Sequence, residues 1–279
     1  MQEKKLRFKP NQLPAYAFGL FFTLLTFVPL YLTLISSFDD NQGIILSMFT
    51  WPEELLWSNY VAAWTSAHMG IAVFNSMFIA IASTVVVIAV SMPAAYVLAR
   101  KKFKLQKLVY TFFLLGVMVP VHSTVIPIAT LATRTGGRNT YWFIVLVYAA
   151  FNLSQSIFLL TGYLRGIDRE LDQAAKIDGC NDYQLLWFIL FPICKPMIAT
   201  VSILTFVFAY GELLFSLILI SHERMYTVAR GMLTFSGAFN QQLGPIFASI
   251  IIAVIPMIVL YLFFHEKVQA GMMAGAIKD

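Results

Sequence analysis

Charged side chains are scarce in this chain. Asp, Glu, Lys and Arg make up 12% of its 279 residues, whereas hydrophobic residues make up 59%. A soluble globular domain carries about 25% charged residues. The composition therefore excludes an ordinary water-soluble fold.

Cysteine and histidine are also rare. The chain has two cysteines, Cys180 and Cys194, and four histidines with no pair spaced four residues apart. Two cysteines are too few for a disulfide framework or a metal cluster, and zinc ligands are usually grouped at short spacings. Neither a metal nor another cofactor is predicted.

The common catalytic and nucleotide-binding motifs are missing. The sequence contains no GxxxxGK[ST] phosphate loop, no HExxH and no GxSxG. It is therefore not expected to bind ATP alone or to be a membrane enzyme. It shows no clear internal repeat, and Glu212 is the one acidic residue well inside an apolar segment. These features argue against a self-sufficient channel or secondary transporter, which stays open as an alternative.

Apolar residues come in long blocks. A helix needs about 20 apolar residues to cross the roughly 30 Å hydrocarbon layer of a membrane. We therefore expect an all-α integral membrane protein with six transmembrane helices. The first block is too long for a removable signal peptide, and no small-residue cleavage site follows it. The six predicted spans are Ala15–Ser36, Ile71–Ala99, Leu108–Ala132, Tyr141–Leu164, Met197–Ile220 and Ile246–Phe264.

Basic residues are unevenly divided between the two sides that six spans define. Fifteen of the 19 Lys and Arg residues fall on the side that holds both termini, and four fall on the other. Because Lys and Arg resist translocation, both termini and the segment Glu170–Pro192 are predicted to be cytoplasmic. The predicted organisation is a tail at 1–14, a transmembrane domain at 15–265 and a tail at 266–279. The net charge of +5 fits anchoring at an anionic lipid face, so no nucleic acid partner is expected.

Polar residues within the predicted spans are candidates for a substrate pathway. At membrane depth such groups face protein or water. An ionisable residue there indicates function by default, but Glu212 could equally be a protonated or hydrogen-bonded packing residue. The candidates are Asn152, Gln155, Tyr210 and Glu212.

The most informative segment is polar and lies between the fourth and fifth spans. Residues 170–192 read ELDQAAKIDGCNDYQLLWFILFP. Good helix formers run from Asp168 to Ile177, with acidic residues early and Lys176 late. Gly179 is suited to ending this helix, and Asn181 or Asp182 to capping a second one. A short helix on the membrane face could pass movement of a soluble partner to the spans on either side.

This segment resembles the EAA loop of binding-protein-dependent ABC importer permeases. The family pattern is Glu-Ala-Ala, three residues, Gly, nine residues, Ile, one residue and Leu-Pro. The chain matches this spacing with Gln173-Ala174-Ala175, Gly179, Ile189 and Phe191-Pro192. Gln173 replaces the family's Glu and Phe191 replaces Leu, so a salt bridge from position 173 is in doubt. The resemblance implies that residues 166–195, here named the coupling loop, dock in a cleft of an ATPase subunit. The implied coupling residues are Glu170, Gln173, Ala174, Ala175, Asp178, Gly179, Ile189 and Pro192.

Other segments are similar to the sugar-importer branch of that family. These are the basic run 100–104, the GELLF run around Glu212 and the Gly-rich tail VQAGMMAGAIKD. The resemblance implies the shorter permease of a bacterial carbohydrate importer in the cell membrane. Its implied partners are a second permease, an ATPase dimer, an external solute-binding protein and a sugar. A permease for another solute, such as phosphate, an amino acid or a glycerol ester, is the alternative.

Overall fold

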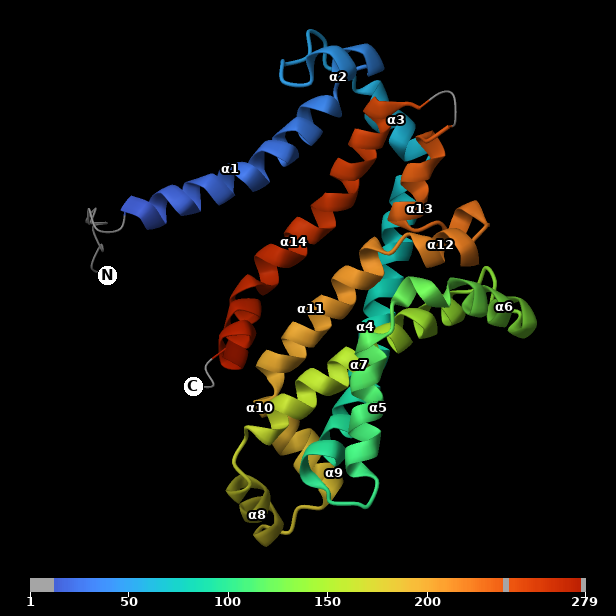
Figure 1. Cartoon of the computed structure of the whole chain (residues 1–279). Coiled ribbons are helices and arrows are strands. Elements are labelled where there is room, and N and C mark those ends of the chain that lie inside the picture. The colour runs from blue at the N-terminus through green and yellow to red at the C-terminus, as the bar shows by residue number, and fades with distance from the viewer. Residues whose placement is uncertain (1–12, 238–240, 277–279) are drawn as a thin grey trace. The chain divides into compact units, whose positions relative to one another are not determined.

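The computed structural model describes residues 13–237 and 241–276 (Figure 1), and it describes the side chains of 14–237 and 241–263. The basic residues used to orient the chain at Lys4, Lys5, Arg7, Lys9, Lys267 and Lys278 lie outside the described side chains, as does most of the two predicted tails. Over the described residues the elements are helices, and Ser236 and Gln241 form an isolated β-bridge. The predicted all-α class is confirmed.

The chain divides into two compact units. The first comprises residues 1–67 and 232–254, and the second comprises residues 68–231 and 255–279. Helix α14 (Leu243–Ala276) contributes its first part to one unit and its remainder to the other. The candidate site lies wholly within the second unit.

The first unit contains α1 (Leu13–Ser36), α2 (Asn41–Ser47), α3 (Ser58–Thr65) and the short η5 (Leu233–Phe235). Buried Asn59 donates to the carbonyls of Ser37 and Asp39, at 3.1 and 2.9 Å. Gly244 lies so close to this corner that a Cβ there would come within 2.6 Å of the Asp39 carbonyl. The Asn59 side chain and the close approach of Gly244 therefore hold this corner together.

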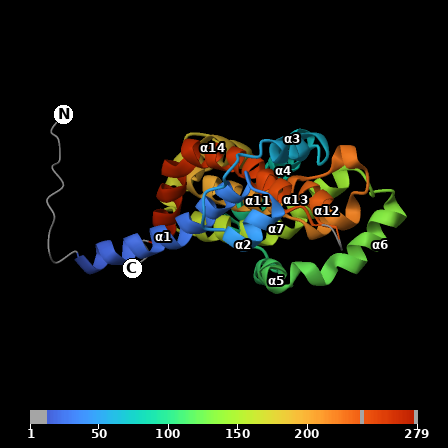
Figure 2. The ribbon, with the colours of Figure 1, turned by 90° about the horizontal axis from the view of Figure 1, so that it is seen from above.

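The second unit is built around three long helices that pack on one another: α4 (Met69–Arg100), α7 (Tyr141–Arg165) and α11 (Lys195–Gly211). Their contacts bury small residues such as Ala80, Ser83 and Ala95. Within a membrane no hydrophobic effect drives helices together, and small residues let the helix backbones approach closely enough for van der Waals packing. Figure 2 shows α5 (Gln106–Met118) and α6 (Val125–Thr135) at the edge of this unit.

Two predicted spans are interrupted. The segment from α5 to α6 bends by 93° through the 3-10 turn η2 (Val121–Thr124), directly after Pro120. Proline cannot continue the backbone hydrogen-bond ladder. The second interruption follows Gly211, where Glu212 turns to an extended conformation before α12 (Leu214–Leu219). The far part of this unit continues with η4 (Glu223–Met225) and α13 (Val228–Met232).

The predicted spans correspond closely to helices, with two corrections. Four described helices are long and apolar enough to cross a membrane. The total is six if two bent pairs each count as one span: Gln106–Met118 with Val121–Thr135, and Asp182–Ile193 with Lys195–Gly211, which bends by 78°. The third predicted span is a bent pair and not one helix. The fifth was predicted to continue to Ile220, which is wrong, because α11 ends at Gly211.

Candidate functional site: the coupling loop and the end of α4

The coupling loop begins with a short capped helix. Helix α8 (Glu170–Ile177) carries Glu170 and Asp172 in its first turn and Lys176 in its last, so its charges complement the helix dipole. The Asp168 carboxylate accepts a hydrogen bond from the Glu170 amide at 3.0 Å. The sequence predicted this helix, and its start lies two residues after the predicted one.

A sharp turn separates α8 from the next helix. Gly179 has φ +84°, and a Cβ there would meet no atom within 4 Å. Glycine is therefore favoured at this position by backbone conformation and not by space. Asn181 then accepts from the Gln184 amide at 2.9 Å, while the Gln184 side chain accepts from the Asn181 amide at 2.9 Å. This reciprocal capping box starts α9 (Asp182–Gln184).

The rest of the loop anchors the site in the core of the second unit. The chain continues through the π-helical η3 (Leu185–Leu190) and α10 (Phe191–Ile193). Leu185 and Leu190 are buried in one apolar cluster with Ala175 of α8 and Ala99 of α4. The small Ala175 side chain thus packs α8 against the transmembrane helices.

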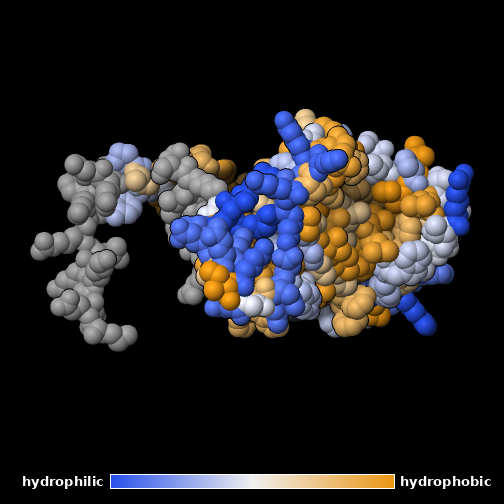
Figure 3. All heavy atoms as spheres, turned by 90° about the horizontal axis from the view of Figure 1, so that it is seen from below, coloured by the Kyte–Doolittle hydropathy of each residue, from blue (hydrophilic) through white to orange (hydrophobic). Residues whose placement is uncertain are grey.

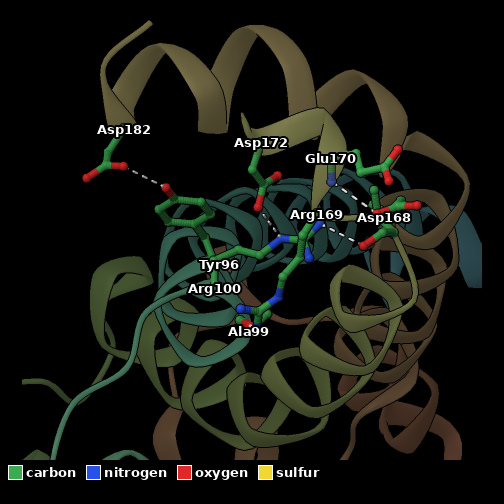
Figure 4. Close-up of polar contacts among 9 residues, drawn as sticks. Tyr96, Ala99, Arg100, Asp168, Arg169, Glu170, Asp172 and Asp182 are labelled. Atoms are coloured by element: carbon green, nitrogen blue, oxygen red, sulfur yellow. Dashed lines mark hydrogen bonds and ion pairs between the residues drawn. The ribbon is translucent and has the colours of Figure 1, made fainter. Parts of the chain in front are cut away.

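A buried ion pair joins α8 to the end of α4. The Arg100 Nε lies 3.0 Å from the Asp172 Oδ2, and the two side chains are 4% and 15% exposed. Figure 4 shows Arg100 reaching from α4 toward Asp172, with Arg169 directed at the carbonyl of Ala99. The Arg100 Nη2 also donates to the Ile167 carbonyl at 3.0 Å. The Arg100 guanidinium therefore contacts both α8 and the non-helical segment that leads into α8.

A second contact holds α9 to the same end of α4. The Asp182 carboxylate accepts from the Lys101 ammonium at 2.6 Å. It also accepts from the Tyr96 hydroxyl at 3.0 Å (Figure 4). The hydrogen bond from Lys101, with that from Tyr96, holds the pKa of Asp182 below its ordinary value. Asp182 stands at the start of the segment that precedes the apolar helix α11, where water reaches it.

Side chains also satisfy the last carbonyl groups of α4. Arg165 and Gln106 donate to the Leu98 carbonyl at 3.5 and 2.8 Å, and Arg169 donates to Ala99 at 3.4 Å. These groups would otherwise be unpaired at a helix end, and cations there also complement the helix dipole. The end of α4 is therefore covered by groups from α5, α7 and the coupling loop.

The opposite face of α8 is open. Most of the predicted coupling residues lie on the exposed side, while Ala175 is buried and Ile189 is half-buried. The Ile177 side chain is 87% exposed at the end of α8. Figure 3 shows hydrophilic residues gathered over this end of the molecule. The exposed predicted coupling residues are Glu170, Gln173, Ala174, Asp178, Gly179 and Pro192.

A separate cleft of about 460 Å³ lies where the two helix interruptions meet. It is lined by His122 of η2, by Phe208 near the end of α11, by Glu212 and by Leu217 of α12. Backbone that leaves the helical conformation at membrane depth must be buried in protein or line a cavity. This cleft supplies that setting.

Glu212 satisfies the backbone at the interruption. Its buried carboxylate accepts from the Leu214 amide at 2.9 Å, from the Phe215 amide at 3.0 Å and from the Tyr148 hydroxyl at 2.8 Å. Of the two interpretations left open by the sequence, this geometry favours a hydrogen-bonded structural group. Glu212 is nevertheless one of the residues that line the cleft.

The other three pathway candidates are placed differently. Asn152 is buried and donates to the Tyr148 carbonyl at 2.8 Å, Gln155 is exposed on α7, and Tyr210 is buried with its ring stacked on Phe206. Among the described residues, the lining of the cleft includes Glu212 but none of these three.

Comparison with known proteins places this geometry in a family. Residues 91–273 match the family of binding-protein-dependent transport system inner membrane components. The chain belongs to this family. The matched region contains the coupling loop, both helix interruptions and the end of α4.

Relatives of this permease match along nearly its full length. An ABC transporter permease protein of Caldicellulosiruptor sp. is 33% identical and aligns over 92% of this chain and 93% of its own. The multiple sugar-binding transport system permease protein of Streptococcus mutans is 30% identical over 91% and 93%. The melibiose/raffinose/stachyose import permease protein of Bacillus subtilis is 29% identical over 90% and 91%.

A solved structure has the same fold as the permease. It is a chain of a bacterial ABC transporter involved in the import of the acidic polysaccharide alginate, with a TM-score of 0.76 and 20% identity. The match covers 93% of this chain and 98% of that one. Membership of its family makes the permease a multi-pass inner membrane component and not the ATP-hydrolysing enzyme of its system.

Sequence reasoning missed two features of the permease site. It used Arg100 and Lys101 to count charge and as part of the basic run that resembles the sugar-importer branch, but nothing in the local sequence marks Asp172 and Asp182 as their partners. It also overlooked His122, whose place in the cleft depends on the bend between α5 and α6. The spacing of Asn181 and Gln184, by contrast, is a recognisable capping signal.

Proposed function

We propose that this permease forms the translocation pathway of an ATP-driven importer for a sugar or oligosaccharide. The support is the agreement among its relatives, whose names specify multiple sugars, melibiose, raffinose and stachyose. Its partners in this proposal are a second permease, a dimer of ABC-type ATPases and an external solute-binding protein. Its surroundings are the lipids of the cell membrane.

The observation that carries the coupling role is the two-sided character of α8. One side is fixed to the transmembrane helices through Ala175 and the buried pair of Asp172 with Arg100. The other side exposes Gln173, Ala174 and Ile177 to a partner. Because α8 is attached in this way, a partner that displaces α8 also displaces the transmembrane helices of the second unit.

The proposed orientation has the coupling loop, residues 166–195, in the cytoplasm with both termini. This follows from the excess of Lys and Arg on that side. The tails 1–14 and 266–279 would then be cytoplasmic, and the transmembrane domain would run from 15 to 265. The segment from Ser221 to Val228, here named the outer segment, would face outside.

The proposed mechanism is alternating access. ATP binding closes the ATPase dimer, and the exposed side of α8 follows the ATPase surface on which it rests. The energy comes from the difference in ATP affinity between the two conformations, because a ligand that binds both equally shifts nothing.

The cleft at the helix interruptions is the proposed part of the substrate pathway contributed by this subunit. Phe208 offers an aromatic face for a sugar ring, and His122 offers a polar group. Glu212 maintains the interruption by accepting hydrogen bonds from the amides that follow it. Asn152, Gln155 and Tyr210 stay predictions for other parts of the pathway.

Uptake by whole cells tests the proposal. Cells that lack this chain are compared with cells that carry it, using radiolabelled mono- and oligosaccharides and, in parallel, phosphate, amino acids and glycerol phosphodiesters. We expect restored uptake of at least one carbohydrate, abolished when ATP is depleted. Restored uptake of a non-carbohydrate alone would assign the permease to another solute. Unchanged uptake of every compound would remove the transport role.

A further inference from the structure

Both ends of α4 are held by groups from distant parts of the chain. At the loop end, Arg100 contacts Asp172 of α8 and Lys101 contacts Asp182 of α9, at 3.0 and 2.6 Å. Two helices of the coupling loop, α8 and α9, are thus attached to a span that is not their neighbour in sequence. The chain connects the loop directly only to α7 and α11.

The far end of α4 holds the outer segment. The buried Asn75 amide donates to the carbonyls of Arg224 and Tyr226, both at 3.0 Å, and its oxygen accepts from Tyr141 at 2.8 Å. Buried Ser76 accepts from the Val228 amide at 2.9 Å. Four hydrogen bonds therefore connect two adjacent residues of α4 with the outer segment and with α7.

The helix between these two attachments is continuous. Helix α4 runs for 32 residues, or about 48 Å, and continues through Pro93. The segments from α5 to α6 and from α11 to α12 are both interrupted. Helix α7 is also continuous, over 25 residues, and leads directly into the coupling loop. A continuous helix transmits a displacement along its axis, whereas an interrupted one can absorb it at the break.

We propose that α4 carries the movement of the coupling loop across the membrane to the outer segment. This inference rests on the proposed function, in which an ATPase moves α8. Two positioning residues make the attachments: Asp172 of α8 binds the loop end of α4, and Asn75 of α4 binds the outer segment. In this account the outer segment changes place when the ATPase closes because it is fixed to the same helix as the coupling loop.

The distance between the two attachments makes the proposal testable. Asn75 and Arg100 are about 37 Å apart along the helix at 1.5 Å per residue. Substitutions at sites more than about 10 Å apart with no shared partner normally have additive free-energy effects. A departure from additivity between the two ends of α4 would therefore show that one element links them, which spatial position alone does not establish.

The experiment is a double-substitution cycle on sugar uptake in cells, normalised to the amount of complex recovered through a tag on this chain. Asp172→Asn and Asn75→Ala are made separately and together. The matched control pairs Asp172→Asn with Asn139→Gly. Asn139 also holds the outer segment, accepting from the Ser221 and His222 amides at 2.6 and 3.1 Å, but it belongs to the loop before α7. Glycine suits its φ of +55°.

We expect each single substitution to lower normalised uptake several-fold, and the Asp172–Asn75 double substitution to be no worse than the poorer single. The control double substitution should give the product of its single effects. A control double substitution no worse than its poorer single would instead assign the transmission to α7, which begins two residues after Asn139, and would overturn the special role of α4. If Asp172→Asn prevents assembly, Lys101→Gln takes its place, because it breaks the more exposed contact with Asp182.

Multiplicative losses in both double substitutions would overturn the role of α4, and so would normal uptake in both single variants. Either result leaves the importer role intact. That role fails separately, if removal of the whole chain does not change uptake.

Discussion

Arg100 and Asp172 form an ion pair of 3.0 Å that is almost closed to solvent, between the last residue of α4 and the first turn of α8. The Oδ1 of Asp172 accepts no hydrogen bond from the described residues. The carboxylate therefore depends on Arg100. The position of α8 against α4 therefore depends on the charge of Arg100.

Removing either member of this pair should destabilise the permease. Loss of one partner of a buried pair costs about 3–5 kcal/mol, whereas replacing both by apolar residues of similar size is often neutral. We expect Asp172→Ala and Arg100→Ala each to lower the thermal unfolding midpoint of the purified complex, and Arg100→Met with Asp172→Leu to recover much of the loss. A double variant that falls by the sum of the two single losses would contradict this account.

The turn after α8 gives a second prediction. Gly179→Val should lower uptake while leaving assembly of the complex partly intact. A β-branched residue in the left-handed region costs roughly 1–2 kcal/mol or more, so the backbone of the turn would shift to avoid that conformation. Gly179→Asn should be milder, since asparagine tolerates this conformation. Uptake and recovery of the complex are measured together for both variants. Normal uptake by the valine variant would show that the turn geometry is not needed.

Glu212 should act as a structural cap. Glu212→Ala leaves the amides of Leu214 and Phe215 without their acceptor, and an unsatisfied buried donor costs about 1–3 kcal/mol. We expect the unfolding midpoint to fall strongly for the alanine variant and less for Glu212→Gln, which keeps one acceptor oxygen. The KM for sugar should change little in the glutamine variant. A large rise in KM with an unchanged midpoint would mean that Glu212 binds the substrate directly.

Filling the cleft should block transport without preventing assembly. Leu217 lines the cleft, so Leu217→Trp places a bulky ring in the proposed pathway. Leu204 is similarly exposed on α11, at 43% compared with 38% for Leu217, but it does not line the cleft. We expect uptake per assembled complex to fall at least ten-fold for Leu217→Trp and to stay close to normal for Leu204→Trp. Equal losses would remove the cleft from the pathway.

The spans were predictable from the sequence because membrane thickness imposes a length and a composition that can be read residue by residue. The turn at Gly179 and the cap at Asn181 were predictable because both are local. Proline made a bend at Pro120 foreseeable, but not a full break of the helix, because Pro29, Pro93 and Pro256 lie inside continuous helices. The end of α11 at Gly211 was not predictable, since the apolar pattern continues through it. At the break, Tyr148, far away in the sequence, joins the amides of Leu214 and Phe215 in binding the Glu212 carboxylate.

The attachment of the coupling loop to α4 lay beyond sequence reasoning for the same reason. Arg100 stands in a dense basic run where each residue serves equally well as a membrane anchor. Only the packing of α4 against α7 and α11 brings it to Asp172. Local patterns therefore predicted which segment docks, whereas tertiary contacts determine which span holds that segment.

The most direct test of the account is to purify this chain through a tag from its native membranes in mild detergent and to identify every protein bound to it. The account predicts an ABC-type ATPase and a second permease in amounts comparable to this chain. Recovery of the chain alone, or only with copies of itself, under conditions that preserve other membrane complexes would contradict it.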